Sequence, residues 1–333
     1  MGLLRVIFLL ILLLFVGGVH VANVVSVYPL ELRSERISFT IPAGSGMKAA
    51  AEIIESAGVD MPSWQLTLLA RGMQRASQIK AGSYEVQRGM TAMELIEMMA
   101  RGDVIMSRIT LVDGKTLRAI RQTLDTHPDL THETKKMSNA QLMAALGAPA
   151  GQLEGLFLPD TYLFDKGASD LDLLRRAYAA MDTKLQQIWA QRDPELPLKS
   201  AQELLILSSI VEEETGASAD RPQIAAVFVN RLRLGMPLQS DPTVIYGLGE
   251  RFDGNLRRVD LTTDTPWNTY TRTGLPPTPI ALPSLEALKA SSKPPASNKL
   301  YFVARGDGSS EFSATLEEHN RAVNRYQKGG RGG

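Results

Sequence analysis

The sequence contains no cysteine, which excludes disulfide frameworks, thiolate metal sites and a cysteine nucleophile. It has only four histidines, and their wide spacing does not favour a metal site: His20, His127, His132 and His319. It also lacks net charge, because 36 basic and 36 acidic side chains cancel, and it has no long basic run. We therefore expect no metal, no cofactor and no nucleic-acid partner.

A long uncharged stretch lies at the N-terminus of this 333-residue chain, which is long enough for about two domains. From Val6 to Leu30, 25 residues follow Arg5 without a charged side chain. As a helix they would span ~37 Å, enough to cross a hydrocarbon core of ~30 Å. A cleaved signal peptide is the alternative, but apolar residues continue beyond Val16 and no A-x-A cleavage site follows. The pattern favours an uncleaved anchor over residues 1–30.

A pattern of β-rich run, glycine and amphipathic helix then recurs three times, as FTIPAGSGMKAAAEII, YEVQRGMTAMELIEMM and ITLVDGKTLRAI. Gly44, Gly89 and Gly114 suit turns that need a permissive backbone, and Thr91 with Glu94 forms a capping box. The repeats predict a small α+β region from residue 37 to about 125. A further helix is expected through WQLTLLARGMQRAS.

The second half of the chain reads as mostly helical. Residues from about 126 to 150 are polar and suggest an irregular connection, and helical patterns follow over 169–191. Ser200 and Glu203 form a capping box for a helix that leads into SSIVEEETG, and a further helix is expected through AAVFVNRL. KLYFVARGDGSSEFS predicts a hairpin, after which Thr315 and Glu318 cap a last helix. The fold class is therefore α+β.

The stretch SSIVEEETG, residues 208–216, joins an apolar helix to three consecutive glutamates. On a helical wheel of ~100° per residue, Glu214 lies ~20° from the centre of the apolar stripe. Glu212 and Glu213 lie ~140° and ~120° away, so we expect those two in solvent. Burial, the negative end of the helix dipole and neighbouring negative charge would each raise the pKa of Glu214, as a general acid near neutral pH requires. A salt bridge to Arg221 or Arg231 is the alternative role.

Other polar groups have alternative readings. Asp160, Asp241 and Glu154 could supply the second carboxylate of a glycosidase pair, but Asp241 equally suits a helix N-cap and Asp160 a turn. Ser208 and Ser209 lack a G-x-S-x-G elbow, which argues against a serine hydrolase. Tyr246 and the stretch 267–270, WNTY, offer aromatic faces on which sugar rings can stack and an amide that can bond to them. The alternative is that these aromatic side chains pack in the hydrophobic core.

Five long motifs in order resemble the endolytic murein transglycosylases, the MltG or YceG-like family: LEGLFLPDTYLF, SSIVEEETG, AAVFVNRLRLGMPLQSDPTVIYGLG, WNTYTRTGLPPTPIALPSLEALKAS and YFVARGDGSSEFSATLEEHNRAV. The resemblance is nearly continuous over 153–326, the expected catalytic domain. Residues 37–103 resemble, more loosely, the LysM-like subdomain of that family. Residues 104–152 would then connect the two parts, and 327–333 would form a flexible tail.

The resemblance implies a lyase, a lytic transglycosylase that cuts the β-1,4 bond between N-acetylmuramic acid and N-acetylglucosamine within nascent peptidoglycan strands. The products would carry 1,6-anhydro ends, and strand elongation would stop. The family's catalytic glutamate falls on Glu214, which would act as general acid and then as base. Lys is common in the family where this chain has Glu213, and Tyr is usual where it has Trp267.

The resemblance further implies a glycan-binding cleft. Its expected lining residues are Asn230, Arg231, Gln239, Asp241, Thr243, Tyr246, Asn268 and Tyr270. The protein would be a single-pass inner-membrane protein with a cytoplasmic N-terminus and a periplasmic catalytic domain, beside nascent strands and peptidoglycan synthases. A muramidase-type hydrolase with a second carboxylate and a non-catalytic peptidoglycan-binding protein are the alternative functions.

Overall fold

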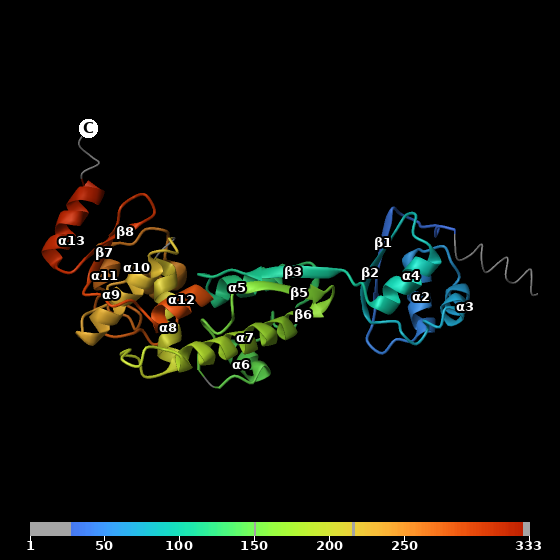
Figure 1. Cartoon of the computed structure of the whole chain (residues 1–333), viewed down its shortest axis with the longest axis horizontal. Helices are drawn as coiled ribbons and strands as arrows, with labels where there is room; N and C mark the ends of the chain where they lie inside the picture. Colours follow the sequence, from blue (N-terminus) through green and yellow to red (C-terminus); the bar gives the residue numbers. More distant parts are fainter. Residues whose placement is uncertain (1–27, 150, 215–216, 329–333) are drawn as a thin grey trace, which may run out of the picture. The chain divides into compact units, whose positions relative to one another are not determined.

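The computed structural model describes residues 28–149, 151–214 and 217–328 and shows a mixed α+β protein (Figure 1). Contacts divide the chain into two compact units. Unit 1 comprises the described residues up to Arg108 together with Leu163–Ala168, and unit 2 comprises Ile109–Tyr162 and the described residues from Ser169 onward. None of the helices in these described ranges is long and apolar enough to cross a membrane. The expected anchor lies, up to residue 27, outside them.

Unit 1 is built on a two-stranded sheet. Its elements are β1 (Arg36–Ile41), α2 (Met47–Ala57), α3 (Ser63–Gly72), β2 (Gly82–Gln87) and α4 (Ala92–Arg101). The two strands are antiparallel, with Arg36 opposite Gln87. In β1, Ile37, Phe39 and Ile41 are buried while the residues between them are exposed, the period-two pattern of a strand with one face in a core. These side chains share one hydrophobic core with the buried faces of the three helices.

All three expected strand–glycine–helix repeats are confirmed. They form β1 with α2, β2 with α4, and β3 (Met106–Leu111) with α5 (Leu117–Asp125). Gly44, Gly89 and Gly114 have φ of +80°, +96° and +69°, in the left-handed region that favours glycine. The capping box of Thr91 and Glu94 is present at α4. The third copy is divided from the others, because its helix α5 belongs to unit 2.

Unit 2 is mainly helical. Beyond α5 its elements are β4 (Leu130–Thr131), α6 (Asn139–Leu146), β5 (Asp160–Asp165), β6 (Ala168–Ser169), α7 (Asp170–Ala190), α8 (Ala201–Glu214), α9 (Arg221–Arg233), α10 (Asp241–Leu248), η1 (Gly249–Arg251), α11 (Arg258–Thr262), α12 (Leu285–Ser292), β7 (Tyr301–Ala304), β8 (Ser310–Ser313), α13 (Leu316–Val323) and η2 (Asn324–Lys328). β3 pairs with β5 and β4 with β6, and the division between the units runs through β3, β5 and β6. The predicted C-terminal hairpin is confirmed as the antiparallel pair β7–β8. The prediction of an irregular segment over 126–150 is wrong, because β4 and α6 form there.

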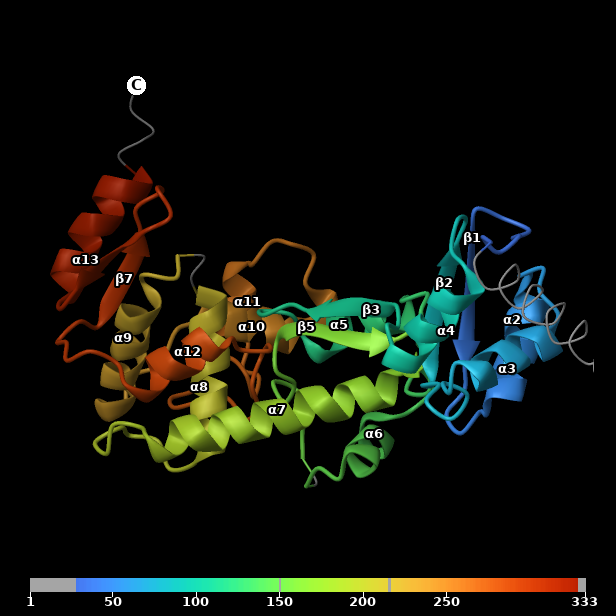
Figure 2. The same ribbon diagram turned by 45° about the vertical axis from the view of Figure 1, so that its right-hand side comes forward.

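Helix α8 lies at the centre of the unit 2 core. It packs against α7, α9, α10 and α12, and Figures 1 and 2 show these helices around it. Every side chain from Leu204 to Glu212 is buried. Even the two serines of α8 are inside, where Ser208 Oγ donates to Leu204 O and Ser209 Oγ donates to Ile206 O, each at 2.7 Å. A helix buried on all sides has no solvent face along this stretch.

The prediction that Glu212 lies in solvent is therefore wrong. Its side chain is buried, and Oε1 accepts a hydrogen bond from Arg221 Nη2 at 2.7 Å. Oε2 accepts from Ser284 N at 2.8 Å and from the Ser284 hydroxyl. The helical wheel assumes one apolar face and one solvent-exposed face. In the structure, α9 and the start of α12 cover the face that carries Glu212. Glu213 is exposed, as predicted.

Candidate active site

A cavity of about 570 Å³ lies beside the C-terminal end of α8. Its polar wall comes from α8, α9, the residues around the start of α10, and Tyr270. Its other wall comes from the β7–β8 hairpin, α13 and η2. The lining residues are Glu214, Arg231, Leu238, Gln239, Asp241, Tyr270, Tyr301, Phe302, Val303, Ala304, Ser310, Leu316, His319, Val323 and Gln327. The cavity thus brings the carboxyl group of Glu214 and the guanidinium of Arg231 close to a partly aromatic wall.

Glu214 is the last residue of α8 and is partly buried in this cavity. Burial raises its pKa to about 7, and the negative charges of Asp241 and Glu213 act in the same direction. The nearby Ser240 hydroxyl and the charge of Arg231 act in the opposite direction. A carboxyl group with this pKa exchanges its proton near neutral pH, which suits a group that first donates and then accepts a proton.

Arg231 supplies a buried positive charge to the same cavity. Its side chain donates only to neutral oxygens among the described residues: to Leu300 O and Leu238 O at 2.8 Å, and to Pro237 O and Gln239 Oε1 at 3.3 Å. These bonds fix the guanidinium but do not neutralise it. The expected alternative partner of Glu214, Arg221, pairs with Glu212 instead. The charge of Arg231 therefore favours the carboxylate form of Glu214.

Asp241 opens α10 and is held by Tyr270, whose hydroxyl donates to Asp241 Oδ1 at 2.5 Å. Burial raises the pKa of Tyr270, and the hydrogen bond to Asp241 adds to the shift. Gln239 precedes α10 with φ of +53°, a left-handed conformation that is uncommon outside glycine. Together with Arg231, these three expected binding residues share the cavity with Glu214.

The other four expected binding residues do not line this cavity. Asn230 Nδ2 donates to Ser297 O and Lys299 O, and the Thr243 hydroxyl donates to Ser240 O. Asn268 is fully buried, and its Nδ2 donates to three backbone oxygens, those of Asp260, Leu261 and Thr263. Their polar atoms are engaged in holding the loops that shape the site. Tyr246 lines a different cavity, described below.

Of the three candidate second carboxylates, only Asp241 shares the cavity with Glu214. Asp160 is exposed and accepts a hydrogen bond from the next backbone N–H, a local turn contact. Glu154 is buried elsewhere in unit 2. Within the described ranges, no group of three or more His, Asp or Glu side chains could hold a metal ion.

The hairpin wall contains functional candidates that no sequence pattern singles out. The Tyr301 ring is stacked on His319 with centroids 5.3 Å apart, and the Arg231 guanidinium lies 5.2 Å from the same ring. Burial and the charge of Arg231 lower the pKa of His319, which favours the neutral imidazole. The motif YFVARGDGSSEFSATLEEHNRAV includes this stretch, but its strand alternation gives no reason to place it at the same cavity as Glu214.

The YceG-like family model matches residues 39–325. The chain belongs to the YceG-like family. A Bacillus subtilis relative named endolytic murein transglycosylase is 31% identical over 340 residues, which cover 94% of this chain and 91% of the relative. A Streptococcus pneumoniae relative of the same name is 29% identical over 334 residues, 90% of this chain but only 60% of the relative. The 2.6 Å crystal structure of a YceG-like protein from Listeria monocytogenes has a TM-score of 0.55 and 28% identity, and the match covers 86% of this chain and 98% of that one.

Proposed function

We propose that this YceG-like protein is an endolytic peptidoglycan lytic transglycosylase in which Glu214 acts first as general acid and then as general base. The observation that carries the proposal is a carboxyl group of pKa about 7 in a cavity that also holds a buried, unneutralised guanidinium. The relatives named endolytic murein transglycosylase supply the substrate and the type of cleavage.

The proposed reaction needs only one protein carboxyl group. Glu214 protonates the glycosidic oxygen between N-acetylmuramic acid and N-acetylglucosamine, and the bond to the departing sugar breaks. The resulting carboxylate, stabilised by Arg231, then takes the proton of the muramic acid C6 hydroxyl. That hydroxyl attacks C1 of its own ring and closes the 1,6-anhydro product. An intramolecular nucleophile replaces the water, and hence the second carboxylate, that a hydrolase requires.

The remaining parts have supporting roles in this proposal. Arg231, Gln239, Asp241 and Tyr270 bind and orient the glycan beside Glu214. Asn230, Thr243 and Asn268 shape the cleft through the loops that they hold. Residues 37–103 form a LysM-like subdomain that helps to bind glycan. The N-terminal anchor places the catalytic domain on the periplasmic side of the inner membrane, where cleavage near the synthases ends strand elongation.

Product analysis tests this proposal. The full-length protein is incubated with uncrosslinked glycan strands, and the products are separated and weighed by mass spectrometry. We expect fragments of several disaccharides that end in 1,6-anhydro-N-acetylmuramic acid, because the C6 hydroxyl attacks and water does not. Reducing ends would instead show a muramidase-type hydrolase, single disaccharides released from strand ends would contradict the endolytic assignment, and intact strands would show a binding protein.

The pH profile of the same reaction provides a second test. Because the pKa of Glu214 is about 7 and the first step needs its protonated form, we expect kcat/KM to fall as pH rises through about 7. Burial also raises the pKa of Glu213 to about 7, so Glu213 gains its negative charge over the same pH range. Because that charge raises the pKa of Glu214, Glu213→Gln should move the upper part of the fall to lower pH. Glu195→Gln, a change at an exposed acid outside the cavity, is the matched control. Rates that stay constant from pH 6 to 9 would contradict the acid role.

A further inference from the structure

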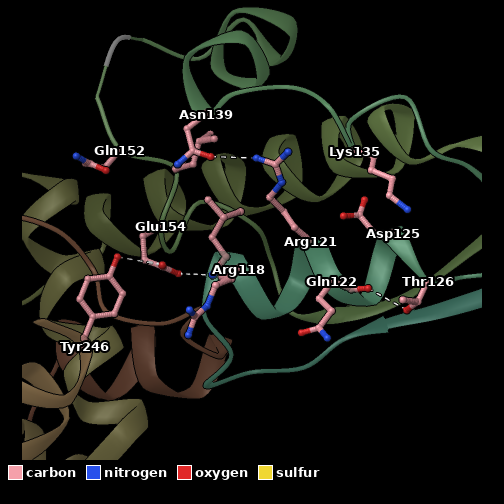
Figure 3. A pocket seen from close by; sticks show the side chains of 12 residues that line it. Arg118, Arg121, Gln122, Asp125, Thr126, Lys135, Asn139, Gln152, Glu154 and Tyr246 are labelled. Carbon is pink, nitrogen blue, oxygen red and sulfur yellow. Dashed lines mark hydrogen bonds between the residues drawn. The ribbon is translucent and has the colours of Figure 1, made fainter. Parts of the chain in front are cut away.

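A second cavity in unit 2, of about 730 Å³, is not used by the proposed reaction. It lies between α5, the start of α6, the segment before β5, and α10 (Figure 3). The lining residues are Leu117, Arg118, Arg121, Gln122, Asp125, Thr126, Lys135, Asn139, Gln152, Leu153, Glu154 and Tyr246. Most of these side chains are charged or carry amides, so the cavity suits a polar ligand with several charges.

One end of the cavity is rigid. Glu154 is 6% exposed, and its Oε1 accepts from Leu117 N at 2.7 Å, the first residue of α5. Its Oε2 accepts from the Tyr246 hydroxyl at 3.1 Å. Figure 3 shows both bonds, with Arg118 at the same end of the cavity. A buried carboxyl group that joins two helices in this way fixes the wall of a binding site.

The rest of the lining offers charges of both signs. Arg121 is held by Thr134 O and Met137 O at 2.8 and 2.6 Å. The side chains of Arg118 and Lys135 are exposed, and Arg118 Nη1 donates to the exposed Glu250 carboxylate at 2.7 Å. Asp125 adds a negative charge at the end away from Glu154 (Figure 3). A ligand that presents carboxylates together with a donor group would complement this set.

Helix α10 connects this cavity with the active site. Asp241, its first residue, lines the cavity of Glu214, and Tyr246 lines the second cavity five residues later, ~7.5 Å along the helix axis. A peptide of four or five residues in extended form spans roughly 15 Å. The axial spacing between these two lining residues of α10 is therefore shorter than a peptide of that length.

We propose that this second cavity binds the peptide stem that muramic acid carries in peptidoglycan, with Arg118 and Lys135 receiving the stem carboxylates. The proposal rests on the proposed function. A bare sugar fits the cavity less well, because sugar rings favour open aromatic faces. The one aromatic lining residue, Tyr246, has its hydroxyl bonded to Glu154 and its ring packed against Trp267 at 5.6 Å.

A comparison of two substrates tests the stem site. kcat/KM is measured for the full-length protein on glycan strands with intact stems and on strands from which an amidase has removed the stems. The double variant Arg118→Ala, Lys135→Ala should lower the ratio of the two values about tenfold, since each substitution removes a charge-assisted hydrogen bond. The double variant Arg175→Ala, Lys184→Ala, which removes two exposed cations of α7 outside the cavity, should keep the parent ratio.

Three results would overturn the stem site. If the parent cleaves both kinds of strand with equal kcat/KM, or if the cavity variant keeps the parent ratio, the stem is not bound there and the transglycosylase assignment is unaffected. If the parent cleaves neither substrate, the proposed function fails and the stem site fails with it. The melting temperatures of both variants are compared with that of the parent to check that they fold.

A competition experiment gives a second readout. A free stem peptide should compete with stem-bearing strands for the parent but not for the cavity variant.

Discussion

Replacing Glu214 by Gln should lower kcat on peptidoglycan strands about a thousandfold, within the range of ~10²–10⁴ that a positioned acid–base group supplies. Gln has nearly the shape of Glu and keeps its packing at the end of α8, but it cannot donate a proton to the glycosidic oxygen. It also cannot accept the proton of the C6 hydroxyl in the second step. Both steps of the proposed reaction are therefore affected by one substitution, while substrate binding by Arg231 and Tyr270 is retained.

The neighbouring residue provides the matched control for this result. Glu213→Gln makes the same chemical change one residue earlier, at an exposed side chain that does not line the cavity. Measured at about pH 6, where both proteins hold Glu214 protonated, it should keep kcat within about twofold of the parent. Binding of uncleaved strands to Glu214→Gln should stay close to the parent. If Glu214→Gln cleaves strands as fast as the parent, the single-acid mechanism is wrong.

The two outcomes at Glu212 and Glu214 show what helical periodicity can and cannot predict. The phase of the apolar residues placed Glu214 toward the core, and the structure has it partly buried with a raised pKa. The same phase placed Glu212 in solvent, because a wheel contains no information on how many neighbours a helix has. Only the fold brings Arg221 and Ser284 against the second face of α8. The charge partner of a buried acid is a tertiary property.

The predicted glycan-binding residues show a similar limit of prediction from sequence. The motifs around Asn268 and Thr243 are as prominent in the sequence as those around Asp241 and Tyr270, and no local pattern separates the two pairs. In the structure the first pair holds backbone oxygens, and the second pair lines the cavity of Glu214. A polar side chain in a prominent motif can either hold the backbone or line the cavity. The local repeats around Gly44, Gly89 and Gly114 were predictable, because turn, cap and strand patterns are encoded within a few residues.

The largest expected effect on stability belongs to Glu212. Glu212→Ala leaves Arg221, whose side chain is only 14% exposed, without its carboxylate partner. It also removes both hydrogen bonds to Ser284, the N-cap of α12. Breaking a buried ion pair by deleting one partner costs ~3–5 kcal/mol, because the remaining charge stays desolvated. We expect the free energy of unfolding of unit 2 to fall by about this amount, measured by urea denaturation followed by circular dichroism.

A matched control and a double variant separate the ion pair from the loss of a side chain. Glu317→Ala breaks an exposed pair with Arg321 on α13, whose side chains are 81% and 64% exposed, and should change stability by less than ~1 kcal/mol. In Glu212→Ala, Arg221→Ala the unpaired charge is gone, so the double variant should be more stable than the sum of the two single losses predicts. Additive losses would show that Arg221 and Glu212 stabilise unit 2 independently. In that case the end of α8, and with it Glu214, is held by Ser284 and apolar packing instead of the buried charge pair.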